Sequence, residues 1–418
     1  MAFILKFGKL LKFALIVMIS AIISFSAVNP AYGQKQQFPA LALKPDTGWP
    51  IWLTNDPVNY LPLITDQSSG LDWIGSYEDE NGRMHDWLII CDDSSPGSIR
   101  LVEITDDNGL SSLAIRKGEL TLPPPGISGL PINPDDGYDW ESISLHEWSG
   151  SIFLSQEGRR EDIGIFAGKI TPSDIFIKEK MSGSAGEVGF IPGHIVNMKK
   201  LALPGWDEVI RGNLSDNMGI EGMDSSSDRL FIGVESPFSF AQRIVSEKST
   251  VLAIWKINPE NPADMENCEL LKAYDTSEFT SALGFTIETI CGLDAIDRNH
   301  VVGIDRDNAV LFALIFSDDG EFESGRIFPL YVPGPEPLKE DDCPELEGLP
   351  KLLRPSLESV AVVPVDGENG EIIEYRIYLA VDPWGPGWAL LGKDWSCPKY
   401  EERLKNLLPA LYRYTVPA

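Results

Sequence analysis

The sequence predicts an all-β protein, a β-propeller built from four-stranded blades. Three observations lead to this prediction. Apolar residues alternate or cluster in short runs, Gly (37) and Pro (31) interrupt the 418-residue chain often, and one pattern of four elements recurs in a fixed order. Apolar residues make up 43% of the chain, enough for a packed core, so a disordered protein is excluded.

Residues 1–33 come first and have the composition of a secretory signal peptide. Three lysines within the first twelve residues precede an apolar run over 13–27, and Ala31-Tyr32-Gly33 supplies the small residues of a cleavage site. The alternative is an uncleaved anchor, but the run is shorter than the ~20 residues of a spanning helix. We therefore expect cleavage before Gln34, one mature domain over 34–418, and a secreted or periplasmic protein.

The mature chain then repeats four elements, in units that start near 72, 141, 221, 294 and 358. The first element is an acid, a variable residue and Ile, Met or Val. The second is a strand ending in an acid, the third an apolar strand, and the fourth a strand usually closing on Pro. The first elements are Asp72-Trp73-Ile74, Glu141-Ser142-Ile143, Glu221-Gly222-Met223, Asp294-Ala295-Ile296 and Glu358-Ser359-Val360. The second elements end at Asp92, Glu157, Glu235, Asp305 and Asp382.

The last unit ends at its third strand, LYRYTVP (411–417), so its fourth strand is missing. The segment ALALKP (40–45) is the candidate for that strand, since a strand borrowed from the N-terminus closes a ring of blades and removes its open edges. We expect five blades. The alternative is six, with a further unit in the long second repeat near 173–190.

The acidic positions of the repeat predict a metal site. The start of a blade's first strand and the end of its second lie on one rim, so both sets of acids converge on the channel mouth. Converging carboxylates repel one another unless protons, cationic side chains or metal ions compensate, and oxygen-only ligands favour Ca²⁺. The alternative is that the acids are turn residues that accept hydrogen bonds from the backbone of the next blade.

Three segments resemble the phytase-like family, which is defined by an esterase-like activity of phytase. They are Asp216 to Met223 with Leu230 to Pro237, Tyr138 to Ile143 with Ser155 to Gly158, and Leu357 to Val360 with Ala380 to Asp382. The resemblance implies a propeller related to calcium-dependent phosphomonoesterases.

Two functions follow as hypotheses. The first is an exported Ca²⁺-dependent esterase or phosphoesterase, and the second is a binding or scaffold propeller with structural Ca²⁺. For the enzyme, the expected catalytic residues are Glu157, Glu235, Arg159 and Arg306. The expected metal ligands are Glu141, Glu221, Glu358, Asp72, Asp294 and Asp382.

The charge balance limits the partners. With 34 basic and 63 acidic residues the net charge is −29, which argues against nucleic acid or an anionic membrane surface as a partner. We expect a monomer that acts on a small ester or phosphate ester.

Among other chemistries, two of the carboxylates could in principle run glycoside hydrolysis, whereas serine hydrolysis is not indicated. No G-x-S-x-G elbow occurs, and of the four histidines His85 and His300 fall at the opposite rim. The repeat phase predicts one disulfide, Cys343–Cys397, and buried thiols at Cys91, Cys268 and Cys291.

Overall fold

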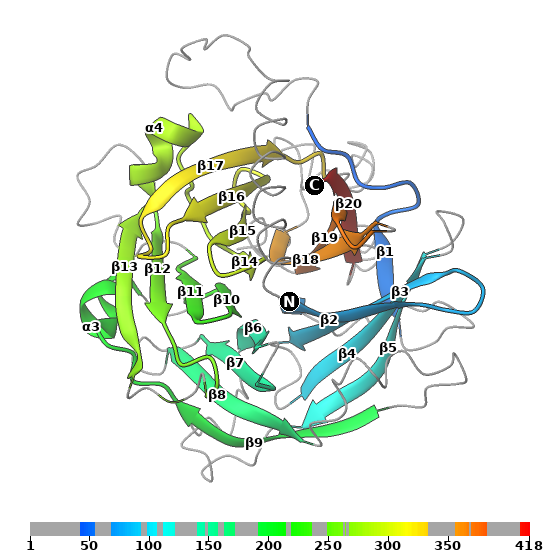
Figure 1. Ribbon diagram of the computed structural model, residues 1–418, viewed down its shortest axis with the longest axis horizontal. Coiled ribbons are helices and arrows are strands. Elements are labelled where there is room, and N and C mark those ends of the chain that lie inside the picture. Colours follow the sequence, from blue (N-terminus) through cyan, green and yellow to red (C-terminus); the bar gives the residue numbers. More distant parts are fainter. Residues whose placement is uncertain are drawn as a thin grey trace, which may run out of the picture.

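The computed structural model is a ring of β-sheets around a central axis (Figure 1). It describes residues 42–54, 68–92, 98–106, 112–121, 140–146, 149–157, 163–171, 191–214, 219–235, 249–261, 264, 267–332, 356–367, 369–382 and 410–418. The expected signal peptide and the expected Cys343–Cys397 bridge lie outside these residues, as does Arg159. Within the described residues, no helix has the length and apolar character to cross a membrane.

The described strands form five consecutive sets of four, each antiparallel, and we call each set a blade. Blade 1 contains β2 (Ser68–Glu78), β3 (Met84–Asp92), β4 (Ser98–Asp106) and β5 (Ser112–Thr121). Blade 2 contains β6 (Trp140–His146), β7 (Ser151–Gln156), β8 (Gly164–Thr171) and β9 (Ile191–Lys200). Blade 3 contains β10 (Gly222–Ser226), β11 (Arg229–Gly233), β12 (Val251–Lys256) and β13 (Glu269–Asp275). Blade 4 contains β14 (Gly292–Ala295), β15 (His300–Asp305), β16 (Val310–Phe316) and β17 (Phe322–Pro329). Blade 5 contains β18 (Ser356–Asp366), β19 (Ile372–Asp382), β20 (Ala410–Pro417) and β1 (Ile51–Thr54).

The prediction of an all-β propeller closed by an N-terminal strand is confirmed. The first strand of each blade lies nearest the centre of the ring in Figure 1, and the fourth lies at its outer edge. The segment near 173–190, where the alternative of a sixth unit was placed, lies almost entirely outside the described residues, so the blade number stays a prediction.

The closing strand differs from the one expected. Residues 51–54 form it: Ile51 pairs with Leu411 and Trp52 with Ala410. The expected segment 40–45 contributes only a bridge from Leu43 to Leu330 of blade 4. The turn between them is held by Asp46, whose Oδ2 accepts a hydrogen bond of 2.6 Å from Arg413 Nε. An N-terminal strand therefore closes the ring, about ten residues later than expected.

Apolar packing between neighbouring blades holds the ring together. Each of five clusters of buried residues contains side chains from two adjacent blades, and together they fill every gap between the described blades. Trp140 packs between blades 1 and 2 and Trp255 between blades 2 and 3, and both side chains are fully buried. Strands such as β7, β11 and β12 are buried at nearly every position, because both faces of a blade contact a neighbouring blade.

The outer strands also connect blades. β1 pairs in parallel with β5, and β5 pairs in parallel with β9, so blades 5, 1 and 2 share hydrogen bonds at the outer edge. These contacts cover strand edges that would otherwise face solvent. The helices are short and lie in connections: α3 (Trp206–Val209) and η2 (Arg211–Asn213) precede blade 3, and η4 (Thr276–Phe279) and α4 (Thr280–Leu283) precede blade 4.

Candidate metal and catalytic site at the channel mouth

The first strands approach one another most closely at one small residue per blade. These residues are Gly70, Ser142, Gly222, Gly292 and Ser359. Each is the point at which the first strand pairs with the second, opposite Cys91, Ser155, Gly233, Ile304 and Ala380 respectively. A Cβ on Gly292 would lie 2.8 Å from the Cα of Ser359, and a Cβ on Gly70 would lie 2.8 Å from the Cα of Ser142. The chain therefore requires small residues here, and this contact sets the register of each blade relative to the next.

The residue before each of these positions lies at the channel mouth. In blades 1, 2 and 5 it is the residue that a register shift leaves without a partner, between Ser68 and Gly70, between Trp140 and Ser142, and between Leu357 and Ser359. A bulge of this kind turns a side chain out of the regular strand alternation. We call the five equivalent residues the mouth ring: Ser69, Glu141, Glu221, Cys291 and Glu358.

The expected ring of acids is therefore only partly observed. Glu141, Glu221 and Glu358 occupy it as predicted. Asp72 and Asp294 do not, because each lies three residues farther along its strand, and the mouth positions of their blades hold Ser69 and Cys291. The sequence pattern of an acid followed by an apolar residue two positions later matches both registers, which is the reason for the difference.

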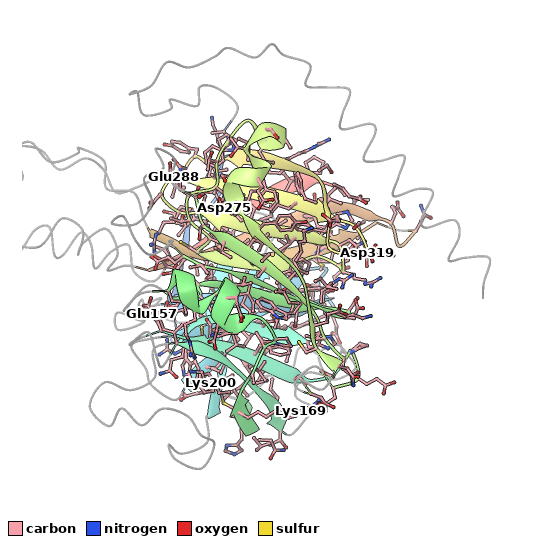
Figure 2. The ribbon with its side chains drawn as sticks, turned by 90° about the vertical axis from the view of Figure 1, so that its left-hand side faces the viewer. Glu157, Lys169, Lys200, Asp275, Glu288 and Asp319 are labelled. Atoms are coloured by element: carbon pink, nitrogen blue, oxygen red, sulfur yellow. The ribbon has the colours of Figure 1, made fainter. Side chains whose placement is uncertain are left out.

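A second set of side chains comes from the ends of the second strands. On the second strand, the partner of the small residue is Ser155 in blade 2, Gly233 in blade 3 and Ile304 in blade 4. Two residues after these partners come Glu157, Glu235 and Arg306 respectively. Glu157 marks this rim in Figure 2, where Asp319 lies on the opposite side of the molecule. Blade 4 thus places a guanidinium where blades 2 and 3 place carboxylates.

Asp305 was expected in this set and instead belongs to a turn. Its carboxylate accepts hydrogen bonds from the Glu288 amide at 2.8 Å, from Thr289 Oγ1 at 3.2 Å and from the Asn308 amide at 3.1 Å. The side chain is fully buried and satisfied by its own loop. The side chains of Asp92 and Asp382 lie outside the described part of the structure.

Arg306 is the cation on which the mouth carboxylates converge. Its Nη1 donates to Glu358 Oε2 at 2.6 Å, and its Nη2 donates to Glu235 Oε1. Glu221 Oε2 lies 3.7 Å from Nη1, too far for a hydrogen bond. One guanidinium from blade 4 therefore joins acids of blades 3 and 5.

Burial and mutual repulsion shape the protonation of this cluster. Burial raises the pKa of Glu221 well above its usual range, and the charge of Glu235 raises it further, whereas Arg306 opposes the shift. The pKa of Glu235 is raised by burial, against the lowering effect of Arg306. Burial likewise raises the pKa of the Cys291 thiol, so Cys291 is neutral in the absence of a metal.

Glu221 has an unsatisfied oxygen. Its Oε2 is buried and accepts no hydrogen bond from the described residues, the nearest cationic atom being Arg306 Nη1 at 3.7 Å, and the residue is 7% exposed. One ligating oxygen each from Glu157, Glu221 and Glu235 lie within 4.8 Å of one another. A buried acceptor without a donor costs about 1–3 kcal/mol, and a cation placed among these three oxygens would remove that cost.

A deeper layer of acids lines the same channel below the mouth. Asp72, Asp224 and Asp294 occupy equivalent positions in blades 1, 3 and 4, two residues after the close-contact glycines. Each accepts a hydrogen bond from the backbone of the next blade, from Leu145 N at 2.6 Å, Ala295 N at 2.6 Å and Val362 N at 2.8 Å respectively. These hydrogen bonds agree with the structural alternative, but one carboxylate oxygen of each acid also lies within 4.8 Å of the other two, so the prediction that Asp72 and Asp294 hold a metal stays a prediction. Their mutual proximity and burial raise the pKa of Asp72 and of Asp294.

Two site residues escaped the sequence analysis: Asp224 and Cys291. The sequence does contain a signal for both residues. The triplet Gly-x-Asp occurs at 70–72, 222–224 and 292–294, and its glycine marks the close-contact position of the first strand. His85 lies away from the site as expected. It is buried beside Glu103, with 2.9 Å between His85 Nδ1 and Glu103 Oε1. Among the described cysteines, Cys91, Cys268 and Cys291 form no disulfide, and Cys268 is only partly buried.

Comparison with known proteins adds little. No protein-family model matches the sequence, and no curated protein matches it.

Solved structures that resemble the fold include a putative 6-phosphogluconolactonase from Bacteroides uniformis, with 11% identity, a TM-score of 0.28 and coverage of 67% of this chain and 60% of that one. An exo-β-1,3-galactanase from Phanerochaete chrysosporium has 8% identity, a TM-score of 0.38 and coverage of 90% and 64%. A β-xylosidase/α-arabinofuranosidase from a compost microbial metagenome has 8% identity, a TM-score of 0.37 and coverage of 88% and 95%. The chain spans less than two thirds of the length of the first two. At these TM-scores the likeness carries no argument about this chain's activity.

Proposed function

We propose that the chain is an exported, Ca²⁺-dependent hydrolase of small esters or phosphate esters, of the phytase-like kind, with its active site at the channel mouth. One observation carries the proposal. Within the part of the chain that the structure describes, the buried Glu221 Oε2 accepts no hydrogen bond, and it belongs to a set of three carboxylates, one oxygen of each lying within 4.8 Å of the others. Oxygen donors in this number suit a hard cation.

The residues that would hold Ca²⁺ are Glu157, Glu221 and Glu235. Ca²⁺ held there would act as a Lewis acid toward an ester or phosphoryl oxygen. Arg306 already binds Glu235 and Glu358, so it orients these two carboxylates and leaves Glu157 to face the cation from the other blade. The Arg306 side chain is 24% exposed, which makes it the group with which the mouth can contact an anionic substrate.

Glu235 is suited to move a proton. In the metal-free site burial raises its pKa, and a carboxylate at the rim within reach of a bound substrate would act as a general base. Glu157 and Glu235 come from the ends of adjacent second strands, so a small substrate at the rim would contact both. The roles of Arg159 and Asp382 as a further cation and ligand remain part of the proposal.

A second candidate is a non-catalytic binding or scaffold propeller with structural Ca²⁺. The bridge from Arg306 to Glu235 and Glu358 favours it, because the same contacts fasten blades 3, 4 and 5 together at the mouth. Under this hypothesis Ca²⁺ stabilises the ring without turnover.

Hydrolysis assays with chelator and Ca²⁺ separate the two functions. The mature chain, starting at Gln34, is assayed with p-nitrophenyl phosphate and p-nitrophenyl acetate after treatment with chelator, and again after Ca²⁺ is restored. Turnover that returns only with Ca²⁺, and that is lost in Glu221→Gln but kept in Glu321→Gln, supports the hydrolase. Glu321 is the control because it is exposed and pairs with Lys272 outside the mouth.

Melting curves read out the metal independently of turnover. A cation that binds only the folded state raises the melting temperature according to RT ln(1 + [L]/Kd). A Ca²⁺-dependent rise without turnover of either substrate favours the scaffold. Identical curves in Ca²⁺ and in chelator would contradict both functions.

A further inference from the structure

The mouth ring contains a thiol where three other blades place carboxylates and one places serine. Cys291 is fully buried, and its Sγ lies within 4.8 Å of a ligating oxygen of Glu221 and of Glu358. The three residues come from blades 3, 4 and 5. This group is distinct from the set of Glu157, Glu221 and Glu235 and shares only Glu221 with it.

Two observations show that positive charge is favoured at this position. Glu221 Oε2 is buried and accepts no hydrogen bond. Arg306 Nη1 lies between the two acids, 2.6 Å from Glu358 Oε2 and 3.7 Å from Glu221 Oε2. The guanidinium is thus a cation in the place that a metal ion would take.

The thiol at this position is not explained by packing alone. Cys91, the other fully buried described cysteine, lies between blades 1 and 2 and donates a hydrogen bond to the carbonyl oxygen of Trp140 at 3.5 Å. Cys291 also packs in an apolar cluster, the one between blades 4 and 5, but it stands at the mouth-ring position that carries glutamate in three other blades, and its electrostatic neighbours are Arg306, Glu221 and Glu358.

We propose that Cys291, Glu221 and Glu358 form a second cation site, selective for a thiophilic divalent metal such as Zn²⁺ or Co²⁺. It extends the proposed function, because Glu221 would then bridge this ion and the proposed Ca²⁺. A thiolate ligand distinguishes the two positions, since sulfur prefers Zn²⁺ and Co²⁺ over Ca²⁺.

Binding requires two changes at the site. The Cys291 thiol releases its proton to solvent as the sulfur–metal bond forms, and Glu221 also releases its proton where its raised pKa keeps it neutral, so at least one proton appears for each metal bound. Arg306 Nη1 gives up its hydrogen bond to Glu358 Oε2. Three protein ligands leave a fourth position for water or substrate, which is the arrangement of catalytic rather than structural zinc sites.

The test is a Co²⁺ titration of the chelator-treated mature chain, followed by absorption spectroscopy. A thiolate bound to Co²⁺ produces a near-ultraviolet charge-transfer band that carboxylate ligands do not produce. We expect the band to saturate at one Co²⁺ per chain and to disappear when Zn²⁺ is added in competition. Cys291→Ser should abolish it, Cys91→Ser should retain it, and Glu358→Gln should weaken Co²⁺ binding by about tenfold or more.

Two results would overturn the second site: no band in the folded native chain, or a band that persists in Cys291→Ser. If Cys291→Ser fails to fold, X-ray absorption at the zinc edge of the native chain loaded with one equivalent of Zn²⁺ decides the matter, because a bound thiolate adds a sulfur neighbour at about 2.3 Å. A zinc shell without sulfur would then reject the site. A missing band together with Ca²⁺-dependent hydrolysis rejects only the second site, whereas a band without hydrolysis rejects only the hydrolase.

Discussion

At the scale of single residues, buried carboxylates at the mouth repel one another. Among the described residues, Arg306 is the main cation that offsets their charge. Glu221, Glu235 and Glu358 are each less than one-tenth exposed, so their charges are poorly solvated. Arg306 donates to two of them and lies 3.7 Å from the third. Breaking such a cluster by removing its cation costs more than the cluster contributes, because the acids remain buried and unpaired.

Replacing Arg306 should therefore destabilise the protein. In chelator at pH 7 we expect Arg306→Gln to lower the free energy of unfolding by about 3–5 kcal/mol, as for other buried pairs that lose one partner. Because Glu221 and Glu235 have raised pKa values, the loss should shrink as the pH falls and they become neutral. Urea titrations between pH 5 and 8 measure this.

Arg298→Gln is the matched control. Its guanidinium is 36% exposed and pairs with Asp228 and Asp318, so its replacement should cost about 1 kcal/mol or less. Equal losses in the two variants would show that the mouth acids do not depend on Arg306.

For the deeper acids we expect a substitution to change the free energy of unfolding in the opposite direction, toward greater stability. Burial and the charge of Asp224 raise the pKa of Asp294. A group whose pKa is raised on folding stabilises the protein fully below its unfolded pKa, and this stabilisation is lost as the pH rises through its folded pKa. Asp294→Asn keeps an oxygen to accept the Val362 amide but carries no charge.

We therefore expect Asp294→Asn to stabilise the protein at pH 7–8, by about 1 kcal/mol or more, and to have little effect near pH 4. Chemical denaturation across that pH range provides the measurement, with exposed Asp319→Asn as the control. Destabilisation at every pH would mean that the ionised carboxylate at 294 is required.

At the scale of elements, the first strand of each blade has a glycine or serine at the close contact between blades, and in blades 1, 2 and 5 a register shift precedes it. The close contact places Gly292 against Ser359 of the next blade, and the residue just before it turns into the mouth. Position 291 therefore reaches the site because position 292 cannot carry a side chain. Packing between blades and the geometry of the site have one structural cause.

Gly292→Ala should disturb the packing between blades 4 and 5 and the geometry of the mouth together. Its Cβ would lie 2.8 Å from the backbone of Ser359, and such overpacking typically costs about 1–3 kcal/mol. The neighbouring Cys291 and Glu358 should move with it, so the Ca²⁺-dependent rise in melting temperature should also fall. Gly212→Ala is the control, since its Cβ would meet nothing nearer than 3.8 Å. A Gly292→Ala protein with native stability and native Ca²⁺ response would contradict the proposed link.

At the scale of the whole molecule, the ring depends on β1, which joins the two ends of the described chain. β1 pairs with β20 of its own blade and with β5 of blade 1. Leu53 is 3% exposed and packs in the cluster between blades 5 and 1. Leu43, from the segment first expected to close the ring, is only partly buried.

These two leucines give a paired test of closure. We expect Leu53→Ala to lower the free energy of unfolding by about 2–5 kcal/mol, as in other cores, and Leu43→Ala to lower it by less. Thermal and urea unfolding of both variants measures the difference. A larger loss of unfolding free energy in Leu43→Ala than in Leu53→Ala would indicate that residues 40–45, and not β1, close the ring.

By itself the sequence determined the class of fold, the order of the strands and the acidic character of one rim. These features are local: period-2 alternation marks strands, and a repeated unit marks blades. Ring closure from the N-terminus followed from the same pattern, because the last unit lacked a fourth strand. Glu141, Glu221, Glu235 and Glu358 were identified from their places in the unit.

Only the tertiary structure decided the register of each blade against the next. An acid followed two residues later by an apolar residue occurs at Glu221 and again at Asp294, and nothing local distinguishes them. The distinction comes from contact between strands about 70 residues apart, where Gly292 must meet Ser359 without a side chain. That contact brings Cys291 to the mouth and leaves Asp294 below it, because sterics between distant backbones, and not the residues' own preferences, determine which side chain faces the channel.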